Sequence, residues 1–304
     1  MEITFCITQT SFFKKKISYD IIIGDKLEYG VYGTDIYPFC IYQLDCFSMP
    51  KDMCVAFIKQ NYGRGINLYW GKYDRSKFLN IMLALPALED EILELFKMVK
   101  RISDYWKCEI KLDGKDIKPE DINEEMIEEY FEKNDEALED LCNEVISNSS
   151  KCEEIECLTY PLVIGEEEAK KFIDSSEEYF KWLNDKQGIG WFYVTPIFTV
   201  NNETHELTGR YTIHEDDMCI FPLVPEPPSF IQDPEPLNCK KYEIHYGYIK
   251  STGDFKYTAN YNDFIKCIPD ENKEYFDPKH ICVVISEEKI IEIFKQLEDK
   301  KTCD

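Results

Sequence analysis

The feature of this sequence that most constrains its fold is an abrupt change of hydrophobic period at residue 86. Residues 3–7 alternate apolar and polar side chains, as half-buried strands do, and further short apolar segments typical of strands follow up to residue 85. Pro86 ends the last of these segments, and residues 88–106 then repeat apolar side chains every three or four positions. That spacing indicates an amphipathic helix, and its acidic first half and basic second half suit the helix dipole. A run of strands is thus followed by one long helix.

The same patterns predict the remaining elements. We expect strands over residues 3–7, 17–23, 53–58, 66–70, 78–85, 108–112, 155–164, 191–200, 206–213, 218–224, 242–249 and 280–285. Residues 61–65 are expected to form a tight connection between two of them. We expect further helices over residues 120–147 (with a break at Asn134 and Asp135), 166–183, 261–268 and 287–301. Because strands and helices do not alternate regularly, the predicted fold class is α+β, with mixed, largely antiparallel sheets and about four to six helices packed on them.

The length of 304 residues allows one large domain or two of ordinary size. A polar segment at residues 147–150 marks a soft boundary. We therefore expect an α+β region with an acidic helical end over residues 1–150, and a second α+β region over residues 151–304. The second region contains a proline-rich loop at residues 222–236. One continuous domain is the alternative.

The charge balance narrows the function classes. Asp and Glu number 59 against 35 Lys and Arg, a formal net charge of -24. A nucleic-acid binder is not expected, because phosphate contacts need a dense basic surface. We also expect no membrane association, since no apolar run is long enough to span a bilayer. No signal peptide is visible, so the predicted location is cytoplasmic and the 13 cysteines are expected to be free thiols.

The densest charge lies at residues 120–140, which hold eleven carboxylates and one lysine. Spread over a helix, these side chains form a negative face that would attract a basic protein and repel nucleic acid and anionic lipid. Glu124, Glu128 and Glu132 are the candidate binding residues on it. A charge that only keeps the protein dispersed is the more frequent use of such a face.

Two other residues are candidate binding residues. Arg64, one of four arginines, stands between Gly63 and Gly65 and could present its guanidinium group to an anion, although a structural ion pair is the more ordinary use. His214 begins a His-Glu-Asp-Asp run that could ligate a hard cation, although a solvated turn is the more ordinary role. The sequence holds no metal, cofactor or nucleophile motif, so we expect no metal and no cofactor and assign no catalytic residue.

Several short segments carry a resemblance to a known family. They are residues 3–7, 27–32, 61–66 and 83–86, the last leading into the helix at residue 88. Together they resemble a bacterial family, domain of unknown function 4299, mainly over residues 1–110. The cysteine-rich residues 40–54 depart from the family pattern. The resemblance implies a bacterial protein in solution, and it supplies neither an activity nor a catalytic residue.

Three functional hypotheses remain open. The first is a non-enzymatic protein–protein interaction module for a basic protein. The alternative is an enzyme or small-ligand binder with an unrecognised site near Arg64 or His214. A third hypothesis, a mimic of nucleic acid, needs a regular array of carboxylates on one face.

Overall fold

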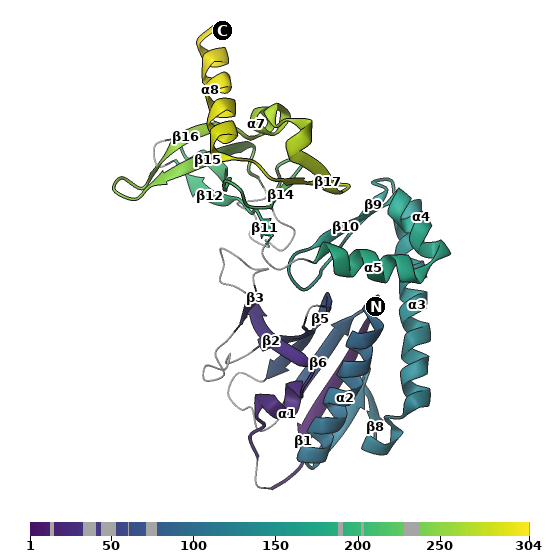
Figure 1. Ribbon diagram of the computed structural model, residues 1–304. Helices are drawn as coiled ribbons and strands as arrows, with labels where there is room; N and C mark the ends of the chain where they lie inside the picture. Colours follow the sequence, from purple (N-terminus) through teal and green to yellow (C-terminus); the bar gives the residue numbers. More distant parts are fainter. Residues whose placement is uncertain are drawn as a thin grey trace. The chain divides into compact units, whose positions relative to one another are not determined.

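The computed structural model describes residues 1–12, 15–32, 41–43, 53–59, 61–70, 78–187, 191–201, 204–227 and 238–303. The chain divides into two compact units, Met1–Gly188 and Ile189–Asp304 (Figure 1). The boundary that the sequence predicts near residue 150 lies inside the first unit.

The first unit is built on one large antiparallel sheet. Its described strands lie in the order β3 (Ile41–Gln43), β2 (Leu27–Tyr32), β4 (Met53–Ile58), β5 (Asn61–Trp70), β6 (Phe78–Ala84), β1 (Glu2–Gln9), β7 (Cys108–Leu112) and β8 (Lys115–Ile117). Every neighbouring pair among them is antiparallel. Because side chains alternate across a strand, β1 buries Ile3, Phe5 and Ile7 on one face.

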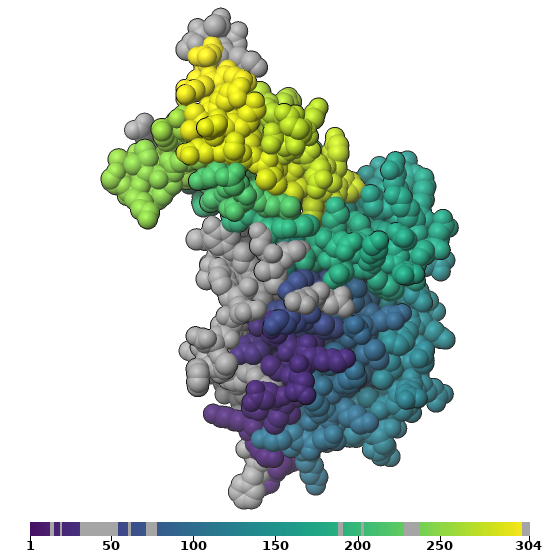
Figure 2. Space-filling model, in the orientation of Figure 1, coloured from purple at the N-terminus to yellow at the C-terminus, as the bar shows by residue number. Residues whose placement is uncertain are grey.

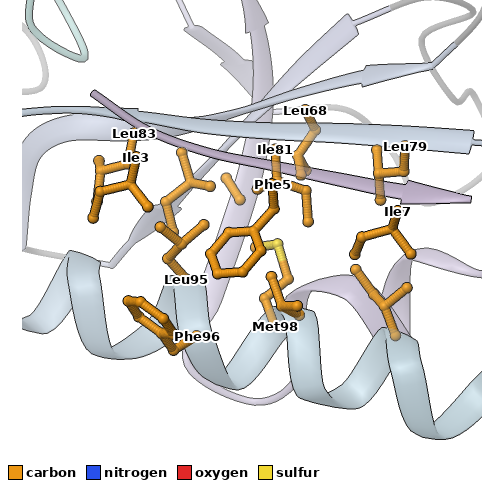
Figure 3. Close-up of a cluster of buried hydrophobic side chains, with 14 of the residues drawn as sticks. Ile3, Phe5, Ile7, Leu68, Leu79, Ile81, Leu83, Leu95, Phe96 and Met98 are labelled. Carbon is orange, nitrogen blue, oxygen red and sulfur yellow. The ribbon is translucent and has the colours of Figure 1, made fainter. Parts of the chain in front are cut away.

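Helix α2 (Glu89–Tyr105) covers that face of the sheet and closes the core (Figures 1 and 3). Leu95, Phe96 and Met98 point from the helix toward the strands. The rings of Phe5 and Phe96 meet edge to face with their centroids 5.3 Å apart, an arrangement that aromatic rings favour. The side chains facing them from the sheet include Ile3, Ile7, Leu68, Leu79, Ile81 and Leu83.

The other described elements of the first unit are helices and one hairpin. They are α1 (Tyr19–Ile23), the 3₁₀ helix η1 (Pro119–Asp121), α3 (Glu124–Ser147), the hairpin of β9 (Cys152–Ile155) and β10 (Leu162–Gly165), α4 (Glu166–Asp174) and α5 (Ser176–Lys186). Helix α3 packs beside α2, where the rings of Phe96 and Tyr130 lie 5.4 Å apart. Its outer side forms part of the blue-teal surface of the first unit in Figure 2.

The described residues of the second unit form two small sheets and two α-helices. One sheet has the order β11 (Phe192–Tyr193), β14 (Cys219–Pro222), β18 (His280–Val283) and β17 (Lys273–Asp277). The other has the order β12 (Ile197–Val200), β13 (Leu207–Thr212), β15 (Lys241–Ile249) and β16 (Asp254–Asn260). Helices α7 (Tyr261–Cys267) and α8 (Glu287–Cys303) and the 3₁₀ helix η2 (Asp270–Asn272) complete it. Aromatic rings fill its core, where Phe264 and Phe294 lie 4.8 Å apart.

The predicted α+β class is confirmed. Most strand pairs are antiparallel, and among the described residues only β11–β14 and β13–β15 are parallel. The described residues include seven α-helices, slightly more than expected. The part of the chain that the structure describes contains no helix that is both long and apolar enough to cross a bilayer.

Two predictions in the first third of the chain are wrong. Residues 17–23 are not a strand, because Tyr19–Ile23 forms α1. The guanidinium group of Arg101 donates hydrogen bonds to the carbonyl oxygens of Ile21, Ile22 and Ile23, so a distant side chain stabilises the end of this short helix. Residues 61–65 are not a connection either, because they form the first half of β5.

Later boundaries also differ from the prediction, three of them between residues 120 and 183. Helix α3 runs unbroken through Asn134. The predicted helix over residues 166–183 is two helices, and the first ends where Ser175 leaves the helical conformation. The predicted strand over residues 155–164 is two strands, because the backbone N–H of Leu158 between them donates to the carbonyl oxygen of Gly63 on β5.

The ten cysteines whose side chains the structure describes are free thiols, as expected. Five of them are buried and five are half-buried. Burial raises the pKa of the Cys142 thiol to about 11, so this thiol is protonated at neutral pH.

Candidate functional site

The first unit contains a polar cavity of about 440 Å³. Ligand pockets in proteins commonly start at roughly 300 Å³, so the cavity has room for one long side chain or a small molecule. It is lined by residues of β5, α3 and β9 and of the segments beside β1, β6 and β9: Met1, Arg64, Leu85, Pro86, Ala137, Asp140, Leu141, Glu144, Glu153, Glu154, Ile155 and Glu156.

The backbone around Arg64 is held by a buried carboxylate. Glu91, in the first turn of α2, accepts hydrogen bonds from the backbone N–H groups of Arg64 (3.1 Å), Gly65 (2.7 Å) and Leu88 (3.1 Å). A Cβ atom at Gly63 would lie 2.3 Å from an oxygen of Glu91. Glycine at position 63 therefore makes room for the carboxylate, which explains why a strand carries a glycine here.

Gly65 is required for a different reason. Gly65 has a φ of +75°, a conformation that favours glycine, and a Cβ there would lie 2.7 Å from side-chain atoms of both Val55 and Leu158. Gly63 and Gly65 thus let β5 approach the helix and the loop after β9 closely. The Gly-Arg-Gly pattern comes from close packing and not from a turn.

The Arg64 guanidinium group has polar atoms without partners. Its Nε and Nη1 atoms are buried and make no hydrogen bond to any residue that the structure describes. Buried donors in native proteins are almost always paired, so unpaired ones beside a cavity indicate a missing acceptor. These two N–H groups are the clearest sign of a ligand in the first unit.

The charge of Arg64 influences the pKa values of two buried groups, Glu91 and Cys157. Burial raises the pKa of the Glu91 carboxyl, while three backbone hydrogen bonds and the charge of Arg64 oppose that rise. Burial also raises the pKa of the Cys157 thiol to about 12, and Arg64 again opposes the rise. Glu91 therefore balances part of the positive charge of Arg64 independently of the carboxylates that line the cavity.

The cavity itself is strongly acidic. Among the described residues that line it, five are carboxylic acids and Arg64 is the only one with a basic side chain. Asp140 and Glu144 are exposed on α3, and Glu156 is exposed after β9. The negative potential reaches neighbouring groups: the pKa of Tyr69 is raised by burial first, and then by the charges of Glu156 and Glu2.

Asn134 helps to hold α3 against the segment that follows β6. Helix α3 carries two of the acids that line the cavity, Asp140 and Glu144. The side chain of Asn134 is buried, and it accepts a hydrogen bond from the N–H of Ala87 (2.8 Å) and donates one to the carbonyl oxygen of the same residue (3.0 Å). Nearby, the hydroxyl of Tyr179 donates to the carbonyl oxygen of Pro86 at 3.1 Å. The segment after β6 is thereby held by two side chains from outside the sheet.

The structure separates the candidate residues that the sequence suggests. Arg64 lines the cavity. Glu124, Glu128 and Glu132 are exposed at one-turn spacing on α3, but they do not line it. A binding role for each of these four residues stays a prediction.

His214 lies in the second unit. It is exposed together with the three acids that follow it, and its ring meets that of Phe192 edge to face at 4.8 Å. Its carbonyl oxygen accepts a hydrogen bond from the Cys219 thiol. Within the described residues, no three His, Cys, Asp or Glu side chains are close enough to hold a metal ion.

The sequence interpretation missed the acids that line the cavity. Glu153, Glu154 and Glu156 follow α3 closely in the sequence, and their density was a possible signal. Among 59 acidic residues that signal is weak, and only the packing of β9 against β5 and α3 brings these carboxylates to Arg64.

Comparison with protein families extends the resemblance seen in the sequence. The model of the family described as domain of unknown function (DUF4299) matches residues 2–293. The chain belongs to the DUF4299 family. The match covers both units of this DUF4299 protein, so the restriction of the resemblance mainly to residues 1–110 is wrong. No curated protein and no solved structure matches the chain.

Proposed function

We propose that the first unit binds a basic protein segment and that the acidic cavity receives one lysine or arginine side chain of that partner. The observation that carries the proposal is a cavity lined by five carboxylates and by Arg64, whose buried Nε and Nη1 atoms have no hydrogen-bond partner among the described residues. The carboxylates favour a cationic group, and the N–H groups need an acceptor. A basic residue in a peptide offers both, because its side chain is cationic and its backbone carbonyl accepts hydrogen bonds.

A small molecule that carries an amine and a carboxylate is the second candidate ligand. It has the same pair of features, and Arg64 could bind its carboxylate in a bidentate manner. The cavity volume of about 440 Å³ suits a ligand of this size. In the first candidate the cationic group belongs to a peptide, and in the second it belongs to a free molecule with its own carboxylate. Binding measurements with a peptide and with a free amino acid can distinguish the two.

The test uses two charge-matched triple variants of the full chain. The cavity variant carries Asp140→Asn, Glu153→Gln and Glu156→Gln. The control carries Glu124→Gln, Glu128→Gln and Glu132→Gln, which removes the same charge from the exposed face of α3. Binding of a fluorescent, end-blocked tetralysine peptide is followed by anisotropy, and binding of free lysine by calorimetry.

We expect the cavity variant to weaken tetralysine binding roughly tenfold or more, equivalent to about 1.4 kcal/mol, and the control to weaken it much less. Equal losses in the two variants would mean that only net charge matters, and the cavity proposal would fail. A loss confined to the control would place binding on the α3 face that the sequence suggested. Tight binding of free lysine without binding of the peptide would favour the small-molecule ligand.

A further inference from the structure

A second group of polar side chains lies in the second unit, in the sheet β11–β14–β18–β17. The Tyr193 hydroxyl oxygen is 3.0 Å from Nε2 of His280, and Nδ1 of His280 is 2.8 and 2.9 Å from the two carboxylate oxygens of Asp277. Tyr193 registers with Ile220, and Ile220 registers with Cys282, two residues from His280. Side chains two residues apart share a face of a strand, so the sheet itself aligns tyrosine and histidine.

The carboxylate fixes which nitrogen of the imidazole carries the hydrogen. Oδ1 of Asp277 accepts hydrogen bonds from the backbone N–H groups of Lys279 (2.8 Å) and His280 (2.9 Å), and a backbone N–H can only donate. An acceptor-only carboxylate beside Nδ1 requires a hydrogen on that nitrogen. In the neutral ring the lone pair is then on Nε2, so the Tyr193 hydroxyl donates its hydrogen to His280.

Burial makes this orientation rigid. The Asp277 side chain is fully buried and that of His280 is 6% exposed, whereas Tyr193 is half-buried and retains access to solvent. Two neighbouring tyrosines are arranged differently. Tyr211 and Tyr261 are buried, and their hydroxyls donate to the backbone carbonyl oxygens of Glu226 and Pro222. Among the described residues, those two hydroxyls have only carbonyl oxygens as acceptors, whereas the Tyr193 hydroxyl lies beside the imidazole of His280.

A hydroxyl, an imidazole and a carboxylate in this order are the arrangement that activates a nucleophile. We propose that Tyr193 is an activated nucleophile that takes up a group from an electrophilic phosphoryl, sulfonyl or acyl centre. The tyrosine oxygen forms the new bond, the bond to the leaving group breaks with its electron pair on that group, and the phenol proton passes to Nε2 of His280. Asp277 is a positioning residue that stabilises the resulting imidazolium ion. The proposal does not depend on the cavity of the first unit.

The test is the rate at which an aryl sulfonyl fluoride labels the full chain, resolved residue by residue by peptide mass spectrometry. Reaction forms a sulfonate ester on the tyrosine oxygen, and fluoride leaves. Tyr275 and Tyr248, which are 77% and 59% exposed, serve as internal references. We expect Tyr193 to react at least tenfold faster than either, although it is less exposed. A rate at Tyr193 equal to or below theirs overturns the proposal without the need for any variant.

Variants separate activation from simple exposure. We expect His280→Gln to reduce labelling of Tyr193 at least tenfold while labelling of Tyr275 is unchanged, and Asp277→Asn to reduce it less. Tyr193→Phe removes the label and leaves the base in place, which confirms the assignment of the modified peptide. Unchanged labelling of Tyr193 in a folded His280→Gln protein would show that His280 only anchors the turn between β17 and β18. If that variant does not fold, the wild-type rate ratio still decides the question.

Discussion

At the scale of single residues, Glu91 connects the fold to the candidate site. One carboxylate accepts backbone N–H groups of two elements, β5 and the start of α2, and it lies against the strand position that must be glycine. Moving this carboxylate would move the backbone that carries Arg64. The conformation of the cavity wall therefore depends on a residue that does not line the cavity.

The buried carboxyl predicts a specific dependence of stability on pH. Because burial raises the pKa of Glu91 in the folded state above the ordinary value of 4.5, the native protein holds this proton more tightly than the unfolded chain does. The contribution of Glu91 to the free energy of unfolding should therefore be most favourable at acid pH and should fall as the pH rises through the folded pKa. Urea unfolding of wild type and Glu91→Gln across this range measures the difference.

The exposed Glu89, in the same helical turn, provides the matched control as Glu89→Gln. We expect the free energy of unfolding of Glu91→Gln to rise relative to that of wild type as the pH rises. The difference in unfolding free energy between wild type and Glu89→Gln should change less over the same range. A difference that moves in the opposite direction would contradict the assigned effect of burial.

These residues also show what the sequence could and could not predict. Alternation in β1 and the spacing of apolar residues in α2 are local patterns, so both elements were predicted. Arg64 attracted notice because glycines flank it, but the side chains that require those glycines are distant in the sequence: Glu91 for Gly63, and Val55 and Leu158 for Gly65. The acids of the cavity converge only through tertiary packing, which no local pattern records.

At the scale of elements, α3 was expected to break at a residue that in fact fixes it. The sequence predicts a break at Asn134 and Asp135, and asparagine indeed has low helix propensity. In the structure its amide pairs with both polar groups of the Ala87 backbone, which is fully buried. Tertiary hydrogen bonds outweigh the local preference.

Replacement of Asn134 should be costly for this reason. Asn134→Ala leaves a buried N–H and a buried carbonyl oxygen unpaired, so we expect a loss of about 2–4 kcal/mol in the free energy of unfolding. Asn143→Ala, at an exposed position of the same helix, controls for helix propensity and should be neutral or slightly stabilising. Chemical denaturation of both variants measures the effect, and a similar stability in the two would refute the role of Asn134.

At the scale of the whole molecule, each unit has its own hydrophobic core. The cluster around α2 and the large sheet belongs to the first unit, and the cluster of aromatic and aliphatic side chains around α8 belongs to the second. The family match spans both units, so the two occur together in DUF4299 proteins. A separate core is nevertheless what an independently folding domain requires.

We therefore expect a fragment of residues 1–188 to fold alone. Its thermal unfolding, followed by circular dichroism, should be cooperative, with a midpoint close to that of the matching transition in the full chain. If the fragment binds tetralysine as the full chain does, the cavity is complete within the first unit. A fragment without a cooperative transition would show that its core depends on residues 189–304.

The order of strands in the large sheet has one more consequence. One edge of that sheet is β8, which is only three residues long and begins with the exposed, charged Lys115 and Asp116. A short, charged edge strand offers few open backbone groups to a strand of another molecule. At this edge the protein is protected against growth into fibres, even at the high concentrations at which long exposed edges polymerise.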